Sequence, residues 1–115
     1  MIRIKRVYDP PGPRDGFRIL IDRLWPRGLT RDKACLSDWR KDLAPSDRLR
    51  KWFNHDPKKW DEFRRRYQEE LRPRAKELRE LARRKRPATI TILYGARDKE
   101  HNNAVALKEL LDELR

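Results

Sequence analysis

The sequence predicts an α/β fold, a single-domain sandwich in which helices flank a small, mostly parallel central sheet. Two strand patterns near the N-terminus and a third near the C-terminus are separated by a long helical region. Strands that alternate with helices usually form a parallel sheet, because the intervening helix carries the chain back across one face. A length of 115 residues suits one domain, so we expect residues 1–115 to share one core.

Two strands are predicted in the first 25 residues. Residues 2–7 (IRIKRV) largely alternate apolar and basic side chains, as in a strand with one buried face. The segment YDPPGPRDG then predicts a stiff loop. Residues 17–25 (FRILIDRLW) are largely apolar on both faces, which is typical of a strand inside a sheet. Asp22 falls within this second strand, where a lone buried carboxylate would be costly, so we expect an ion pair. Its expected partner is Lys5, Arg23 or Arg97.

Helical patterns fill the middle of the chain, after an ambiguous segment at residues 36–43 that could form a short strand. Ser46 can cap a short helix, and Asp56 followed by Pro57 is a common helix start. The helix that follows carries an apolar stripe at spacings of three and four. This stripe consists of Trp60, Phe63, Tyr67 and Leu71. Pro73 is expected to kink or divide the helix.

The C-terminal region predicts a strand followed by a final helix. Residues 88–94 (ATITILY) are rich in the β-branched side chains that favour strands. Asp98 can serve as the N-cap of the final helix. Five apolar residues of this helix should face the core: Ala104, Leu107, Leu110, Leu111 and Leu114.

Composition excludes several kinds of site. Cys35 is the one cysteine, which rules out an intrachain disulfide and a multi-cysteine zinc site, and the two histidines lie far apart, so we expect neither a metal nor another cofactor. The chain has no GxGxxG or Walker-type glycine loop. It also has no apolar stretch near the roughly 20 residues of a membrane span and no signal-peptide pattern. We therefore expect a soluble cytoplasmic protein with no membrane association.

Polar segments follow two of the predicted strands, and ligands of open parallel sheets bind beyond the carboxyl ends of strands. The segments are residues 22–28 (DRLWPRG) and residues 94–102 (YGARDKEHN). If their strands are neighbours, both segments border one pocket suited to an anionic small molecule, such as a nucleotide or another phosphorylated metabolite. The candidate ligand-binding residues are Arg23, Arg27, Arg97, Trp25, Tyr94 and Asn102. The candidate catalytic residues are His101, Asp22 and Asp98.

Each candidate also has a structural alternative. An arginine guanidinium matches phosphate or carboxylate with two hydrogen bonds, yet many arginines only form ion pairs. His101 would lie in the first turn of the final helix, where the helix dipole favours a neutral imidazole base, or it could be a surface histidine. Trp25 could stack on a ligand ring or cover the core. Whether the protein is an enzyme is left open by the sequence.

The formal net charge of +12 supports a second interpretation, a nucleic-acid-binding or accessory module. Arginines at residues 64–66 and the basic residues 83–86 would then form the contact face. Many of these residues alternate with Glu and Asp along helices, which favours surface ion pairs instead. The aromatic helix could also form a contact between two copies, so we expect a monomer or a homodimer.

Four segments resemble the YeaO-like branch of the domain-of-unknown-function 488 family. They are KRVYDPP, DRLWPRG, HDPKKWDEFRRRY and LYGARDKEHNNA, which occur in the same order from about Arg3 to Leu111. The resemblance implies a compact α/β domain with no established reaction, cofactor or substrate. Cysteines of the wider family tend to fall where this chain has Tyr94 and Asn102, so the resemblance argues against a thiol mechanism.

Overall fold

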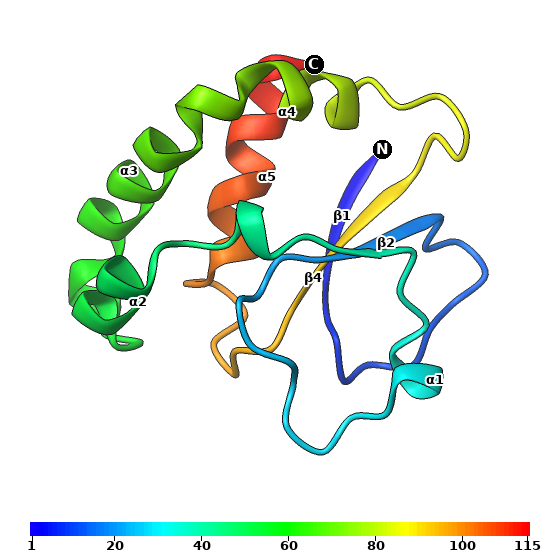
Figure 1. Ribbon diagram of the computed structural model, residues 1–115, viewed down its shortest axis with the longest axis horizontal. Coiled ribbons are helices and arrows are strands. Elements are labelled where there is room, and N and C mark those ends of the chain that lie inside the picture. Colours follow the sequence, from blue (N-terminus) through cyan, green and yellow to red (C-terminus); the bar gives the residue numbers. More distant parts are fainter.

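Four strands form one parallel sheet in the order β1-β4-β2-β3 (Figure 1). A computed structural model describes all 115 residues and places β1 at Ile2–Arg6, β2 at Phe17–Leu20, β3 at Asp38–Trp39 and β4 at Ile90–Tyr94. Ile92 of β4 lies opposite Ile4 of β1 and Ile19 of β2. The strand that comes last in the sequence is therefore inside the sheet, and all five of its residues are buried. The predicted α/β class is confirmed.

Most of the helical structure packs together on one face of the sheet. The helices there are α2 (Asp47–Phe53), α3 (Trp60–Leu71), α4 (Ala75–Ala82) and α5 (Asn103–Leu114), whereas α1 (Arg31–Ala34) lies apart from them (Figure 1). Short 3-10 turns span Lys41–Leu43, Pro57–Lys59 and Arg72–Arg74. Ser46 accepts a hydrogen bond from the backbone N–H of Leu49, and Asp56 accepts one from that of Lys58, so both predicted caps are confirmed.

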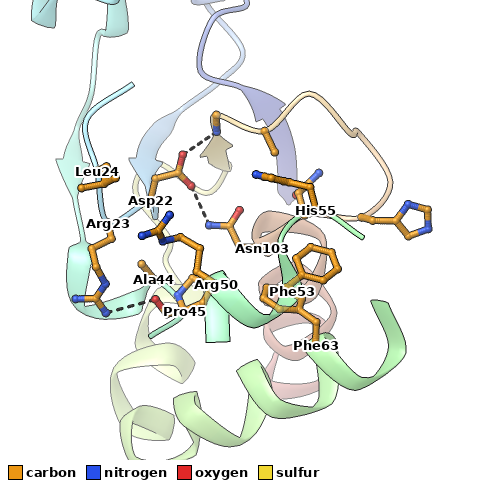
Figure 2. Close-up of a pocket in the computed structure, with 14 residues that line it drawn as sticks. Asp22, Arg23, Leu24, Ala44, Pro45, Arg50, Phe53, His55, Phe63 and Asn103 are labelled. Carbon is orange, nitrogen blue, oxygen red and sulfur yellow. Dashed lines mark hydrogen bonds between the residues drawn. The ribbon is translucent and has the colours of Figure 1, made fainter. Parts of the chain in front are cut away.

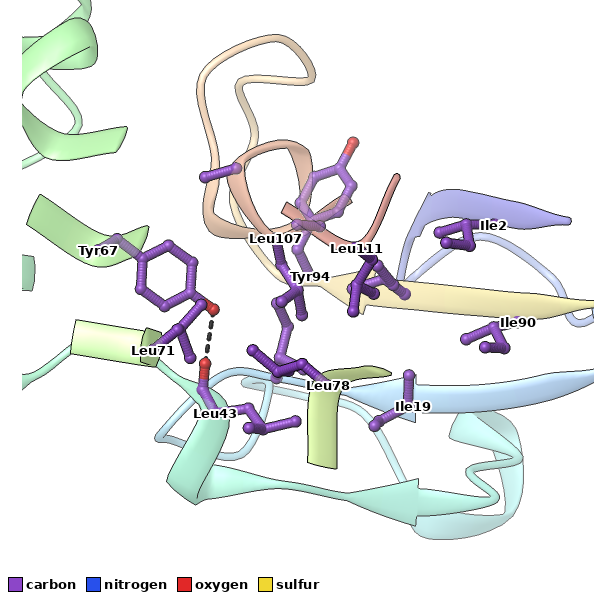
Figure 3. Close-up of a cluster of buried hydrophobic side chains, with 14 of the residues drawn as sticks. Ile2, Ile19, Leu43, Tyr67, Leu71, Leu78, Ile90, Tyr94, Leu107 and Leu111 are labelled. Atoms are coloured by element: carbon purple, nitrogen blue, oxygen red, sulfur yellow. Dashed lines mark hydrogen bonds between the residues drawn. The ribbon is translucent and has the colours of Figure 1, made fainter. Parts of the chain in front are cut away.

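The larger core lies between the sheet and α2–α5 (Figure 3). Alternate strand residues such as Ile19 and Ile90 face it, because successive side chains of a strand point to opposite faces. From the predicted stripe of α3, Phe63, Tyr67 and Leu71 are buried. The hydroxyl of Tyr67 donates a hydrogen bond to the carbonyl oxygen of Leu43 at 2.5 Å. This bond satisfies a polar group that would otherwise be costly to bury.

The opposite face of the sheet holds a buried ionic cluster. Asp15 is 2% exposed and accepts hydrogen bonds from Lys5, Arg18 and the backbone N–H of Gly12. Burial alone would raise the pKa of Asp15, but these three donors outweigh burial and hold its pKa below the ordinary value. Arg18 also donates to the carbonyl oxygens of Ala34 and Cys35. The cluster therefore ties the proline-rich loop to β2 and to the end of α1.

Several boundaries differ from the sequence prediction. β1 ends at Arg6 and β4 begins at Ile90, where strands over residues 2–7 and 88–94 were expected, and two further differences affect the site. The second strand ends at Leu20 instead of residue 25, and Leu24 is 64% exposed. Strand pairing stops there because the backbone N–H of Gly95, directly after β4, donates to the side chain of Asp22. This N–H is therefore not free to bond to the backbone of the neighbouring strand. The final helix begins at Asn103 with Asn102 as its N-cap, so the prediction that Asp98 caps this helix was wrong.

Candidate functional site

A cavity of about 270 Å³ lies at the carboxyl ends of β2 and β4 (Figure 2). We call it the strand-end cavity. Its lining comes from residues 22–24 after β2, from residues 95–96 and 101–103 after β4, and from Ala44, Pro45, Arg50, Phe53, His55 and Phe63. The chain leaves β2 toward β3 and leaves β4 toward α5, which packs on β1 and β4. Ligands of open α/β sheets bind where neighbouring strands connect in different directions in this way.

Asp22 lies at the junction of the two strand ends. Its Oδ2 accepts a hydrogen bond from the backbone N–H of Gly95 at 2.8 Å, and its Oδ1 accepts one from Nδ2 of Asn103 at 2.9 Å (Figure 2). Burial raises the pKa of Asp22, and the two hydrogen bonds and the charge of His55 oppose this rise without cancelling it. The carboxyl group of Asp22 is thus held in place by neutral donors.

The prediction that Asp22 forms an ion pair with Lys5, Arg23 or Arg97 is wrong. Lys5 pairs with Asp15 at 3.1 Å on the other face of the sheet, and Arg23 points to Asp47, with 3.6 Å between Nε and Oδ1. Arg97 is exposed. The prediction placed Asp22 inside a strand, whereas its true position after the strand lets a backbone N–H and an amide take the place of a cation.

Two arginines of the strand-end cavity share one carboxylate. Arg23 Nε and Arg50 Nη2 lie 3.6 Å and 3.4 Å from the same Oδ1 of Asp47, whose side chain is 59% exposed. Arg23 also donates to the carbonyl oxygen of Pro45 at 3.4 Å, and its buried Nε has no hydrogen-bond acceptor. One exposed carboxylate neutralises two guanidinium groups poorly, so this side of the cavity carries excess positive charge.

His101 and Asp98 form a pair in the turn before α5. Nδ1 of His101 lies 2.9 Å from Oδ2 of Asp98, and the imidazole packs edge-on against Trp60 with 5.4 Å between ring centroids. Asp98 also accepts hydrogen bonds from the backbone N–H groups of Glu100 and His101. The bond from Glu100, followed by those from His101, lowers the pKa of Asp98. His101 lines the cavity, whereas Asp98 lies behind it and orients the imidazole.

Four of the nine sequence-predicted site residues line the cavity: Asp22, Arg23, His101 and Asn102. Asn102 is 3% exposed, and its side chain is occupied as the N-cap of α5, with Oδ1 accepting from the backbone N–H of Val105 at 3.1 Å. Its Nδ2 donates to the carbonyl oxygen of Asp98 at 2.9 Å. Asn102 therefore shapes the cavity wall while its polar atoms are already bonded.

The other five lie outside the lining. Asp98 pairs with His101 and does not line the cavity. Tyr94 is 4% exposed and packs in the larger core. Trp25 donates from Nε1 to the carbonyl oxygen of Leu29 at 2.6 Å and packs edge-on against Trp39, which matches the alternative of a core cover. Arg27 and Arg97 are exposed.

Several lining residues were missed from the sequence. Arg50 belongs to α2, for which the sequence predicted a cap but no site residue, and Asn103 follows Asn102 directly, with no signal that set it apart. His55 has a φ of 56° and follows Asn54, whose φ is 46°. Left-handed backbone at two consecutive residues that are not glycine is uncommon, and the Asn-His sequence was the one available signal for it. Phe63, which belongs to the predicted apolar stripe, and Phe53 are stacked with centroids 4.2 Å apart and form the apolar wall of the cavity.

Comparison with known proteins agrees with the architecture. The family model described as the inactive DUF488-N3 subclade matches residues 1–115. The uncharacterized protein YeaO of Escherichia coli (strain K12) is 40% identical over 113 residues, which is 98% of this chain and 98% of YeaO. The uncharacterized protein Rv3073c of Mycobacterium tuberculosis (strain ATCC 25618 / H37Rv) is 42% identical over 113 residues, which is 96% of this chain and 93% of that protein.

No solved structure matches the chain. None of its helices combines the length and the apolar character needed to cross a membrane. The family model covers every residue, and the two relatives cover nearly all of them, so the similarity extends over the whole domain. The chain belongs to the domain-of-unknown-function 488 family, within the branch that includes YeaO.

Proposed function

We propose that the strand-end cavity binds a small anionic molecule, and that Arg23 and Arg50 bind its anionic group. The observation that supports this most directly is the shared use of Asp47 by both guanidinium groups. A phosphate or carboxylate between the two arginines would accept charge-assisted hydrogen bonds from both guanidinium groups, which one exposed aspartate accepts only in part.

The neighbourhood of α5 supports the same proposal. The helix spans 12 residues, and its first residues, Asn102 and Asn103, line the cavity. The N-terminus of a helix carries a partial positive charge, which favours nearby anions. A volume of about 270 Å³ is at or below the lower end of ligand pockets, typically about 300–1,000 Å³, and thus favours a compact phosphorylated or carboxylated metabolite.

Binding without turnover is the role that we favour. The family model that matches the chain is described as an inactive subclade. The pair of Asp98 and His101 has the geometry of an oriented acid or base, and Asp22 carries the raised pKa that such groups often have. A reaction at these residues would require His101, so loss of a measured turnover in His101→Ala would establish catalysis in place of simple binding.

The test is thermal stabilisation by phosphate and by a panel of phosphorylated and carboxylated metabolites. Arg23→Gln and Arg50→Gln should each reduce the ligand-induced shift in Tm, because each removes one guanidinium from the cavity. Arg27→Gln and Arg97→Gln are matched controls, since both arginines are exposed and lie outside the lining. Equal loss in all four variants, or no stabilisation of the wild-type protein, would exclude the proposal.

A basic surface near the amino ends of the strands supports a second candidate function, nucleic-acid binding. Of the two arginine groups considered from the sequence, residues 64–66 are paired with acidic side chains on and near α3: Asp61, Glu62, Glu69 and Glu109. Arg83, Lys85 and Arg86 are exposed at the end of α4 and in the loop that follows. This loop enters the amino end of β4, away from the strand-end cavity.

Salt dependence distinguishes the two functions. If nucleic acid binds here, affinity for a DNA or RNA oligonucleotide should fall steeply between about 50 and 200 mM salt. Replacement of Arg83, Lys85 and Arg86 by Gln should lower the slope by about one unit for each phosphate group that the variant no longer binds. Replacement of the paired Arg64 and Arg65 is the control. An affinity that does not change with salt would exclude nucleic-acid binding.

We further propose a cytoplasmic location, which the lone cysteine supports.

A further inference from the structure

Two carboxylates, one on a face of the sheet and one beyond the ends of its strands, are held in different ways. Asp15 lies in a cluster with three cations, Arg3, Lys5 and Arg18. Asp22 receives its two hydrogen bonds from a backbone N–H and an amide, both of which are neutral. The difference is notable because Asp22 lines a cavity that is otherwise rich in cationic side chains.

Asp22 forms no hydrogen bond or ion pair with the arginines and histidines of the cavity. Arg23 and Arg50 contact Asp47, His101 contacts Asp98, and His55 acts on Asp22 only through its charge. Two neutral donors occupy one acceptor direction on each oxygen of Asp22, and a carboxylate has about four such directions in total. The carboxylate therefore retains acceptor capacity on the side that faces the cavity.

The strand-end cavity therefore contains groups of opposite charge. Arg23, which donates to the carbonyl oxygen of Pro45, and Arg50 provide excess positive charge, and Asp22 provides a carboxylate without an ion-pair partner at the strand ends. Phe53 and Phe63 form an apolar wall in the same cavity (Figure 2). A ligand with an anion alone would leave the carboxylate of Asp22 without a cation, which is costly for a charge that is partly removed from water.

We infer that the ligand is a zwitterion: its anionic group binds Arg23 and Arg50, and its protonated amine binds the carboxylate of Asp22. This inference rests on the proposed anion-binding function and adds the chemical class of the ligand. An ammonium group donates up to three hydrogen bonds and has no acceptor, so it suits the free acceptor sites of Asp22. The apolar wall favours a short hydrocarbon or aromatic spacer between the two charges.

The test compares ligands of equal size with and without the amine. One pair is 4-(aminomethyl)benzoate and 4-ethylbenzoate, which differ by an ammonium group in place of a methyl group. A second pair is 6-aminohexanoate and heptanoate, which covers a flexible spacer. Isothermal titration calorimetry at neutral pH should show about tenfold tighter binding of the zwitterion in at least one pair, as expected for a hydrogen-bonded charge pair.

Variants assign the preference to Asp22. Asp22→Asn keeps an acceptor for the N–H of Gly95, and it should abolish the preference for the zwitterion while the plain carboxylates still bind. Asp56→Asn is the matched control: it removes a nearby carboxylate that lies outside the cavity, and Asn also caps helical turns. A preference that survives in Asp22→Asn would overturn the inference.

The outcomes for the two proposals are separate. If plain carboxylates bind and depend on Arg23 and Arg50 but the amine adds nothing, the zwitterion inference is wrong and anion binding stands. If neither member of either pair binds and the anion panel also fails, both proposals are wrong. If Asp22→Asn does not fold, carbon-13 NMR of the Asp22 carboxyl in the wild-type protein gives the same answer. Titration of that carboxyl should move to lower pH with the zwitterion only, and an unchanged titration would overturn the inference.

Discussion

The backbone N–H of Gly95 donates a hydrogen bond to Oδ2 of Asp22 at 2.8 Å and so joins the ends of two neighbouring strands. Gly95 directly follows β4, and Asp22 lies two residues beyond β2. The bond ends the pairing of the sheet and positions the carboxyl group in the strand-end cavity. The glycine in LYGARD and the aspartate in LIDRL thus belong to one structural unit.

Gly95→Ala should destabilise the protein because a Cβ at this position would lie 2.9 Å from Oδ2 of Asp22. Relief of such a contact requires the carboxyl group or the backbone to shift, at a cost of about 1–3 kcal/mol in the free energy of unfolding. Urea denaturation measures this cost. Gly12→Ala is the control, since its Cβ would have its nearest contact at an ordinary 3.5 Å. Equal stability of the two variants would contradict the predicted close approach.

Asp15→Ala should be among the most destabilising single substitutions, with a loss of about 3–5 kcal/mol in the free energy of unfolding. The variant leaves the buried guanidinium of Arg18 without its carboxylate partner. Chemical denaturation at neutral pH gives the magnitude. A loss below about 1 kcal/mol would show that water or another acceptor replaces Asp15 easily.

Acid titration should reveal the same ion pair. The pKa of Asp15 in the folded state lies below its ordinary value of 3.8. The stability that its ionised form provides is therefore present above pH 3.8 and is lost as pH falls through the folded-state pKa. In Asp15→Asn this contribution to the acid dependence should disappear, which unfolding midpoints recorded between neutral and strongly acidic pH would detect. An identical acid dependence in the wild-type protein and Asp15→Asn would be evidence against the assignment.

Asp22 should show the opposite pH dependence. Because the folded-state pKa of Asp22 is raised above its ordinary value of 3.8, ionisation of this carboxyl group costs stability. The cost is absent well below pH 3.8 and is complete once the pH exceeds the folded-state pKa. Asp22→Asn should then gain stability relative to the wild-type protein as pH rises toward neutrality. Thermal unfolding across this pH range without ligand measures the difference. If Asp22→Asn became less stable relative to the wild-type protein as pH rises, the prediction would be contradicted.

Asn102→Ala should cost about 1 kcal/mol in the free energy of unfolding, since Asn102 is the N-cap of α5. Asp98→Ala removes a cap from the preceding turn and the partner of His101, and it should leave the first turn of α5 intact. Amide hydrogen exchange of Val105 separates the two variants, because its N–H group donates to the side-chain Oδ1 of Asn102. Faster exchange in Asp98→Ala than in Asn102→Ala would reverse this assignment.

The architecture was largely predictable because hydrophobic spacing reports burial. The alternation in residues 2–7 and the stripe at Phe63, Tyr67 and Leu71 depend on local geometry alone. The structure buries the stripe, and on β1 it buries Ile2 and packs the half-buried Ile4 against the larger core. The end of the second strand was not predictable in this way. Residues 17–25 are apolar enough to continue as a strand, and pairing stops at Leu20 because of a contact with Gly95, which is more than 70 positions away in the sequence.

The sequence predicted where the candidate site lies better than it predicted which residues line it. The rule for carboxyl ends of parallel strands points to the loops after β2 and β4, which do border one cavity. Arg50 and His55 come from α2 and its end, and nothing in their local pattern shows that α2 packs beside this edge. Arg27 and Arg97 were as plausible as Arg23 by residue type, and only the course of the loops separates them.

The position of β4 between β1 and β2 has a consequence for synthesis on the ribosome. β1 and β2 make no ladder with each other, and both pair with a strand that begins at Ile90. Neither can complete its hydrogen bonds until most of the chain has emerged, so the nascent polypeptide exposes two unpaired strand edges during most of its elongation. The basic side chains of Arg3 and Lys5 on β1 are well placed to discourage aggregation in that interval.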